Sequence, residues 1–196
     1  PDLLHQYIQL GIDYFGVTES NDNLWAGNGG HNSGRKLPIL FAGVALDHDG
    51  MQHVDALFSE DDQTYYWTKP DGTKKPVFTI AKGNANAKHE EVPPDQRDSF
   101  GRGSNNWRKA EGYRKLNGPT WVPHALAARL MGAKELWNHD PFFDYVDRWM
   151  KEQNSAHGFA KAMWYKHREQ ADRIGEQVKA ARGEGEQADA EAVDDE

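Results

Sequence analysis

Apolar residues recur over the first seventeen positions with the spacing of a helix that is covered on more than one side. One seam begins at Leu3, and a second seam runs beside it from Leu4. Steps of three and four residues place side chains on one helix face. The sequence therefore predicts a helix over 3–17 with a wide apolar face, formed by Leu3, Tyr7, Leu10, Tyr14 and Val17 beside Leu4, Ile8, Ile12 and Phe15.

A second apolar run, Leu37 to Leu46, follows a polar loop rich in glycine that begins at Gly27. Pro38 suits a first helical turn, and the turn-forming residues 47–50 suit the end of that helix. We therefore predict a loop that leads into a buried helix. Glycines leave room for a ligand, and loops held on rigid helices often carry function. A surface turn that only caps a core helix is the alternative interpretation.

The middle of the chain changes character. Strand-forming residues at 64–68, turn residues at 69–72 and a second β-prone run at 77–80 predict a short β-hairpin. The polar stretch 81–109 is expected to be a long functional or disordered loop. Together these segments form a predicted hairpin and loop insertion over about 52–112.

Helical patterns return in the last third of the chain. They predict helices over 119–130, over 141–150 after the start signal Asn138-His139-Asp140-Pro141, and over 159–181. The remaining residues offer little to bury. We therefore expect one helical domain over 1–182 and a disordered acidic tail over 183–196.

The formal net charge of −8 is concentrated in this tail, since Glu184 to Glu196 holds seven acids and no base. The rest of the chain is near neutral, so the sign of the total charge says little about the ligand. No basic patch stands out, and we therefore expect no nucleic-acid partner. No apolar run has the length of a membrane span, so no membrane partner is expected. Cysteine is absent, which excludes disulfides and thiolate chemistry.

Two segments carry a resemblance to a known class of protein. They are Gly29 to Gly43 (GGHNSGRKLPILFAG) and Ala127 to Asp140 (AARLMGAKELWNHD), the second continuing to Trp149-Met150. Over roughly 3–150 the chain resembles the closing part of large bacterial (α/α)n toroid proteins, which are similar in build to polysaccharide lyases of the alginate and heparin type. Toroids also host glycoside hydrolases, and fold analogy gives no function by itself.

The resemblance implies a mainly α fold, an incomplete (α/α)n toroid of helical hairpins with a short β-hairpin insertion. A closed toroid needs more helix pairs than the four or five helices predicted here. Because the chain begins with Pro1 rather than Met, we expect it to be processed or fragmentary. The missing N-terminal helices are then expected upstream or on a separate chain. The other expected partner is the polysaccharide substrate, and the resemblance implies a secreted or periplasmic bacterial protein.

The activity implied is β-elimination in a polysaccharide that contains uronic acid. Such a lyase neutralises the substrate carboxylate, removes the adjacent C5 proton and protonates the leaving oxygen. In this sequence, His31 and Tyr113 are the candidate catalytic groups. Histidine suits base chemistry near neutral pH, and Arg114 next to Tyr113 would favour its phenolate. The candidate substrate-binding residues are Trp25, Asn32, Arg35, Lys36 and Arg114, and neither a metal nor a cofactor is expected.

Other interpretations remain open from the sequence. Arg35 could simply pair with an acid, and His31 could cap a helix. A glycoside hydrolase would need two carboxylates, with Asp22, Asp47, Asp49 and Glu111 as candidates. A noncatalytic carbohydrate-binding or scaffold domain is a third possibility. Asp47, His48, Asp49 and His53 could bind a metal, although Asp and His are common at helix ends without one.

Overall fold

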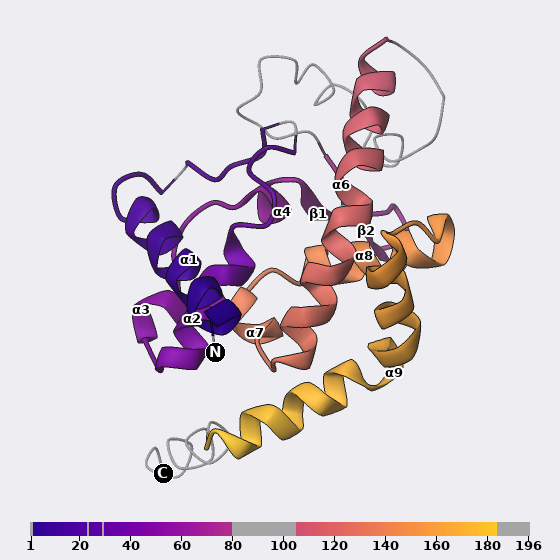
Figure 1. The fold of residues 1–196 in the computed structure, drawn as a ribbon. Helices are drawn as coiled ribbons and strands as arrows, with labels where there is room; N and C mark the ends of the chain where they lie inside the picture. The colour runs from indigo at the N-terminus through magenta and orange to yellow at the C-terminus, as the bar shows by residue number, and fades with distance from the viewer. Residues whose placement is uncertain (1, 23, 29, 80–104, 184–196) are drawn as a thin grey trace, which may run out of the picture.

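The computed structural model describes residues 2–22, 24–28, 30–79 and 105–183, and for 105–111 and 113 it describes the backbone alone. This part of the chain is mainly helical and contains a small antiparallel sheet (Figure 1). No helix in these ranges is both long and apolar enough to cross a membrane. In chain order the elements are α1 (Asp2–Thr18), α2 (Lys36–Leu46), α3 (Asp49–Gln52), α4 (Ser59–Asp62), β1 (Thr64–Thr68), β2 (Lys74–Phe78), α6 (Asn105–Leu130), α7 (Lys134–Trp137), α8 (Asp140–Gln153) and α9 (Gly158–Ala181).

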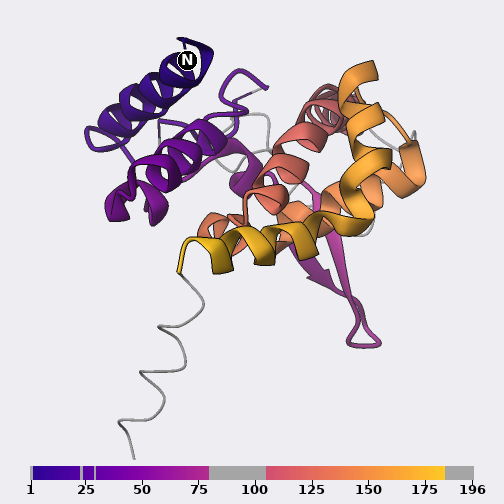
Figure 2. The ribbon, with the colours of Figure 1, turned by 60° about the horizontal axis from the view of Figure 1, so that its bottom comes forward.

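The first two predicted helices are present, and they lie side by side at one end of the molecule (Figure 2). Their close approach depends on Gly11. A Cβ atom at this position would lie 2.2 Å from the Pro38 carbonyl oxygen and 2.6 Å from the Ala42 Cβ. Because that space is filled by backbone, only glycine lets α1 cross α2 at this distance.

The two helices differ in burial. Helix α2 is covered on several sides, as the sequence predicts, and Ile39, Leu40 and Ala42 are fully buried. Helix α1 uses only part of its apolar face, with Ile8, Tyr14 and Phe15 packed on the cluster that contains Ile39. On its outer side Leu3 is 80% exposed, Leu4 is 50% exposed and Ile12 is 39% exposed.

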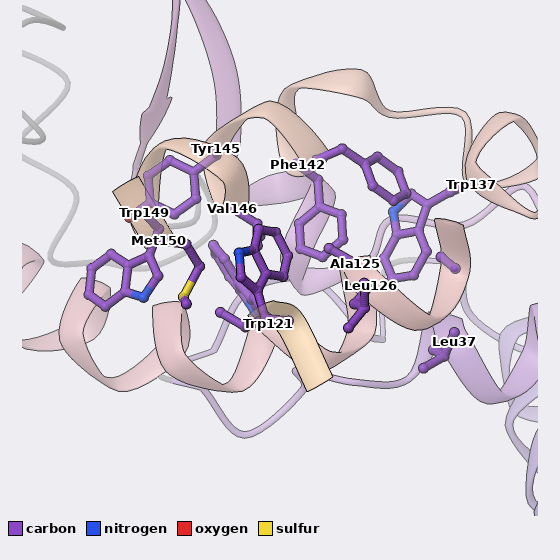
Figure 3. Close-up of a cluster of buried hydrophobic side chains, with 14 of the residues drawn as sticks. Leu37, Trp121, Ala125, Leu126, Trp137, Phe142, Tyr145, Val146, Trp149 and Met150 are labelled. Atoms are coloured by element: carbon purple, nitrogen blue, oxygen red, sulfur yellow. The ribbon is translucent and has the colours of Figure 1, made fainter. Parts of the chain in front are cut away.

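A second, larger core consists mainly of aromatic side chains from α6, α7 and α8 (Figure 3). The side chains of α8 recur every three or four residues and point at α6, so Phe142, Tyr145 and Trp149 all face inward. The Trp137 ring stacks on Phe142 with centroids 4.7 Å apart. Trp121 of α6 meets Phe142 edge-on at 5.8 Å. These contacts join three elements into one apolar layer.

Helix α6 begins earlier than the sequence predicts. Pro119 suggests a helix start, and 105–112 belong to the predicted insertion, yet one helix runs from Asn105 to Leu130 with Pro119 and Pro123 inside it. A proline in a helix interior costs a hydrogen bond. Tertiary partners stabilise the turn before Pro119: Arg114 Nε donates to the Tyr145 hydroxyl and Asn117 Nδ2 donates to Gln63 Oε1, both within buried surroundings.

Charged side chains hold α9 against α6 and α8. Arg129, which is buried, lies 2.5 Å from a carboxylate oxygen of Asp172 on α9 and 3.2 Å from one of Asp147 on α8. Arg168 of α9 contacts the same Asp147 carboxylate through two nitrogens, at 2.7 and 2.5 Å. Paired arginine and carboxylate groups of this kind give directional attachment. The final helix is therefore fixed by charge as well as by packing.

The predicted β-hairpin is confirmed, with a shift in its second strand. Strand β1 pairs with β2 in a register that places Thr64 opposite Phe78 and Thr68 opposite Lys74. The turn contains Gly72 with φ +82°, as predicted. The second strand begins at Lys74 rather than at 77, because Lys74, Lys75 and Pro76 pair with β1 although they are not strand-forming residues. The hairpin turn projects away from the helices in Figure 2. Val77 and Phe78 at its base are buried.

The mainly α class with a small β element is therefore confirmed. The incomplete (α/α)n toroid, and the further helices expected to complete it, stay predictions. Most of the predicted loop over 81–109, and the acidic tail beyond Gly183, lie outside the described residues.

The two glycines of α1 allow a matched test of the α1–α2 contact. We expect Gly11→Ala to reduce the free energy of unfolding by about 1–3 kcal/mol, because the added methyl group has no space. Gly16 meets nothing within 4 Å, so Gly16→Ala should instead stabilise the protein by about 0.5–1 kcal/mol through helix propensity. Urea unfolding of both variants measures the difference. Equal effects would contradict the close crossing.

Candidate functional site

The glycine-rich loop is held in place by three consecutive carboxylates of the short helix α4. The Gly34 amide donates to Glu60 Oε1 at 2.6 Å, and the Gly27 amide donates to Asp62 Oδ2 at 3.0 Å. The acid between these two in the sequence, Asp61, accepts a hydrogen bond from Lys36 Nζ at its Oδ2 atom, at 2.6 Å. Backbone and side-chain donors at three points of the loop are thus satisfied by one four-residue helix, which fixes the loop conformation.

Glu60 is the most buried of these acids and has no exposed surface. Its Oε1 atom also accepts a hydrogen bond from Ser33 Oγ at 3.2 Å and lies 3.5 Å from His124 Nδ1. Burial alone would raise the pKa of Glu60, but His124 and the Gly34 amide outweigh it, so the pKa lies below its usual value. Glu60 is therefore a buried carboxylate that remains ionised at neutral pH.

Helix α6 supplies two side chains of this cluster from the same face, three residues apart. Trp121 Nε1 donates to Ser33 Oγ at 2.6 Å, and His124 packs on Gly34. A Cβ atom at Gly34 would lie 2.9 Å from His124 Cε1, and Gly34 has φ +84°, so this position requires glycine on two grounds. The His124 side chain is 23% exposed, although its Nδ1 is buried.

A histidine beside a buried carboxylate is a common arrangement for proton transfer. The carboxylate favours a proton on the nearer ring nitrogen and leaves the farther nitrogen free to accept one. In this cluster Glu60 can act as the orienting carboxylate, and His124 can act as the proton acceptor. Ser33 is not placed as a nucleophile, because its hydroxyl already binds both Trp121 and Glu60.

Some of the predicted site residues serve the conformation of the loop itself. Asn32 Nδ2 donates to the carbonyl oxygens of Leu24 and Ala26, at 2.9 and 2.8 Å. Arg35 donates to the Tyr14 hydroxyl at 2.9 Å and lies over the rings of Tyr14 and Trp25. These contacts show that Asn32, Arg35 and Trp25 stabilise the conformation of the loop. Their predicted role in substrate binding stays a prediction.

The two remaining predicted cations are buried. Lys36 is 5% exposed and donates to Asp61 and to the Trp137 carbonyl oxygen, at 2.6 Å each. Arg114 is 1% exposed and lies under the Trp149 ring, 5.0 Å from its centroid. This burial argues against direct contact between Arg114 and a polysaccharide, whereas Lys36 can reach a ligand through a cavity that it lines.

His31 of the loop is exposed, as expected of a group that meets a substrate. Its backbone is fixed at both ends, since its amide donates to the Asn28 carbonyl at 2.9 Å and its carbonyl accepts from Arg35 at 3.4 Å. The side chain of Tyr113 lies outside the described part of the structure. The predicted pairing of His31 with Tyr113 therefore stays a prediction.

The alternative metal ligands act at helix ends instead. His48 Nδ1 accepts a hydrogen bond from the Met51 amide at 3.2 Å, which caps α3. His53 Nδ1 lies 3.0 Å from Asp49 Oδ1, one helical turn away. Within the described ranges, no three His, Asp or Glu side chains form a group suited to a metal ion.

Sequence reasoning missed Glu60, Asp61 and His124. A run of acids such as Ser59-Glu60-Asp61-Asp62 is usually solvated, and nothing in its pattern marks Glu60 as buried. His124 offered a weak signal, since it follows Trp121 by three residues on a predicted helix. Its partner lies 64 positions away in the sequence, so only the folded chain identifies the pair.

The lowered pKa of Glu60 predicts a pH effect on stability. At neutral pH, Glu60→Gln should lower the free energy of unfolding by about 1–3 kcal/mol, since it removes a buried charged acceptor. The contribution of Glu60 is complete above its unfolded pKa near 4.5 and is lost as pH falls through the lower folded pKa. Urea unfolding from pH 7 to pH 2.5 should therefore show the difference between the two proteins shrinking below about pH 4.5. A difference that grows in acid would contradict this assignment.

Comparison of the chain with protein-family models, with curated proteins and with solved structures finds no significant match in any of the three. The geometry of the Glu60–His124 cluster and the chemistry of the loop above it are thus the observations that bear on function.

Proposed function

We propose that this chain is part of a polysaccharide lyase that cleaves a polymer containing uronic acid by β-elimination. One observation carries the proposal: His124 sits against the buried carboxylate of Glu60, directly beside a rigid glycine-rich loop. The loop adds an exposed histidine, His31, and an arginine, Arg35. The resemblance of 29–43 and 127–140 to toroid proteins supplies the reaction class, and the cluster supplies groups able to perform it.

The reaction removes the C5 proton of a uronic acid, forms the double bond between C4 and C5 and breaks the bond from C4 to the glycosidic oxygen. In the proposed mechanism, His124 accepts the C5 proton on Nε2, with its other nitrogen held towards Glu60. Arg35 pairs with the substrate carboxylate and so makes the C5 proton more acidic. His31 or Tyr113 then gives a proton to the leaving oxygen. No bound metal or cofactor is needed for this proton balance.

The test is an activity assay in which the product itself identifies the reaction. The full chain is incubated with alginate, heparin, hyaluronan and pectate, and absorbance of the 4,5-unsaturated uronic product is recorded. New reducing ends without this absorbance would indicate a glycoside hydrolase. Binding without either signal would indicate a noncatalytic carbohydrate-binding domain, and both outcomes would overturn the proposal.

If lyase activity is present, His124→Asn should lower turnover by roughly 10²-fold or more, in line with general acid–base contributions. His31→Ala should do the same if His31 is the second proton-transfer group, and Tyr113→Phe if Tyr113 is. His5→Ala is the matched control, because His5 is exposed on α1 and lies far from α6 in the sequence. A His124→Asn variant that folds and retains full turnover would remove His124 from the mechanism.

The proposal also includes the expected surroundings of the chain. The outer side of α1 exposes Leu3, Leu4 and Ile12, which suits coverage by the further helices of a toroid. The same resemblance suggests a secreted or periplasmic protein. Both points depend on the resemblance and would fall with it.

A further inference from the structure

A cavity of about 480 Å³ is lined by Asp61 of α4 and not by Glu60 or His124. Its walls come from α7, from the segment 53–56 and from the start of α2. The polar lining groups are Lys36, His53, Asp55, Asp61, Glu135 and Asn138, and Val54 and Leu136 add apolar surface. A volume of this size suits a small molecule.

Lys36 provides a buried donor at this cavity. Its ammonium group lies between the rings of Phe58 and Trp137, with Nζ 5.3 and 5.4 Å from their centroids. Two of its three N–H groups bind Asp61 and the Trp137 carbonyl. Among the residues that the structure describes, the third N–H has no acceptor, and a buried donor without one is costly. A ligand oxygen in the cavity would satisfy it.

The remaining charge of the lining is negative. Asp55, Asp61 and Glu135 contribute three carboxylates against the single ammonium of Lys36. Lys179, which does not line the cavity, pairs with Glu135 at 3.3 Å, and His53 of the lining lies 3.0 Å from Asp49 Oδ1. One negative charge therefore remains uncompensated even after both lysines are counted. A positively charged ligand is favoured, and a uronate carboxylate is repelled.

We propose that this cavity binds a small organic amine that also carries hydroxyl groups. The amine faces Asp55 and Glu135 at the mouth, and a hydroxyl oxygen accepts the third N–H of Lys36 at the base. Asn138 and Asp61 can accept hydrogen bonds from further hydroxyl groups. This inference does not depend on the proposed lyase activity, because none of the residues involved belongs to the Glu60–His124 cluster.

Isothermal titration calorimetry with three sugars of similar shape tests the proposal, using D-glucosamine, D-glucose and D-glucuronate as probes. We expect D-glucosamine to bind with a Kd in the millimolar range and to bind at least about threefold more tightly than D-glucose. D-Glucuronate should bind most weakly of the three. Equal affinities, a preference for D-glucuronate, or no saturable binding of D-glucosamine up to roughly 50 mM would overturn the proposal.

Variants locate the site. Asp55→Asn and Glu135→Gln should each weaken D-glucosamine binding by roughly two- to fivefold, because each removes a partly exposed charge. Both should leave D-glucose binding nearly unchanged, which a general loss of folding would not do. Glu19→Gln is the matched control, since Glu19 is exposed at the end of α1 and does not line the cavity. Binding of D-glucosamine that is insensitive to Asp55→Asn and Glu135→Gln would place it elsewhere and refute the assignment.

Discussion

The attachment of the glycine-rich loop to α4 is the interaction on which the rest of the candidate site depends. Glu60, Asp61 and Asp62 bind three separate points of the segment 27–36, and each faces a different partner. Glu60 turns towards α6 and Asp61 towards α7, so this short helix joins the α1–α2 pair to the aromatic core. Asp61 and Lys36 form an ion pair in this region, and removing one member would leave the other uncompensated.

The same arrangement separates two chemical environments on either side of α4. On one side a carboxylate with a lowered pKa lies beside a histidine that is partly open to solvent. On the other side burial raises the pKa of Asp61, although Lys36 and the Trp137 indole act against it. The pKa values of two adjacent acids are thus shifted in opposite directions, because the groups around them in the folded protein differ. Their sequence context is the same. The first environment suits proton transfer, and the second suits binding of a polar ligand.

The rigidity of this region comes from packing as much as from charge. Gly11 lets α1 lie against α2, and Gly34 lets His124 lie against the loop, so both glycines act through the space that they leave to a neighbour. The stacked rings of Trp137 and Phe142 fix α7, whose carbonyl oxygen at Trp137 then accepts from Lys36. The aromatic core and the loop are therefore coupled through Lys36, as they also are through the hydrogen bond from Trp121 Nε1 to Ser33 Oγ. If Lys36 binds a ligand, as predicted, it must do so while its side chain stays buried.

The sequence by itself determined the features that follow from local pattern: helices α1, α2, α8 and α9, the β-hairpin and the buried character of α2. Apolar spacing and turn residues act over a few positions, and so they can be seen without a structure. Only the tertiary structure decided that Arg114 and Lys36 are buried, that α6 continues through Pro119, and that Glu60 meets His124. Charged and polar side chains have the same local pattern whether they are solvated or paired. Whether such a side chain is solvated or paired depends on partners that lie up to 101 residues away in the sequence, as for Lys36 and Trp137.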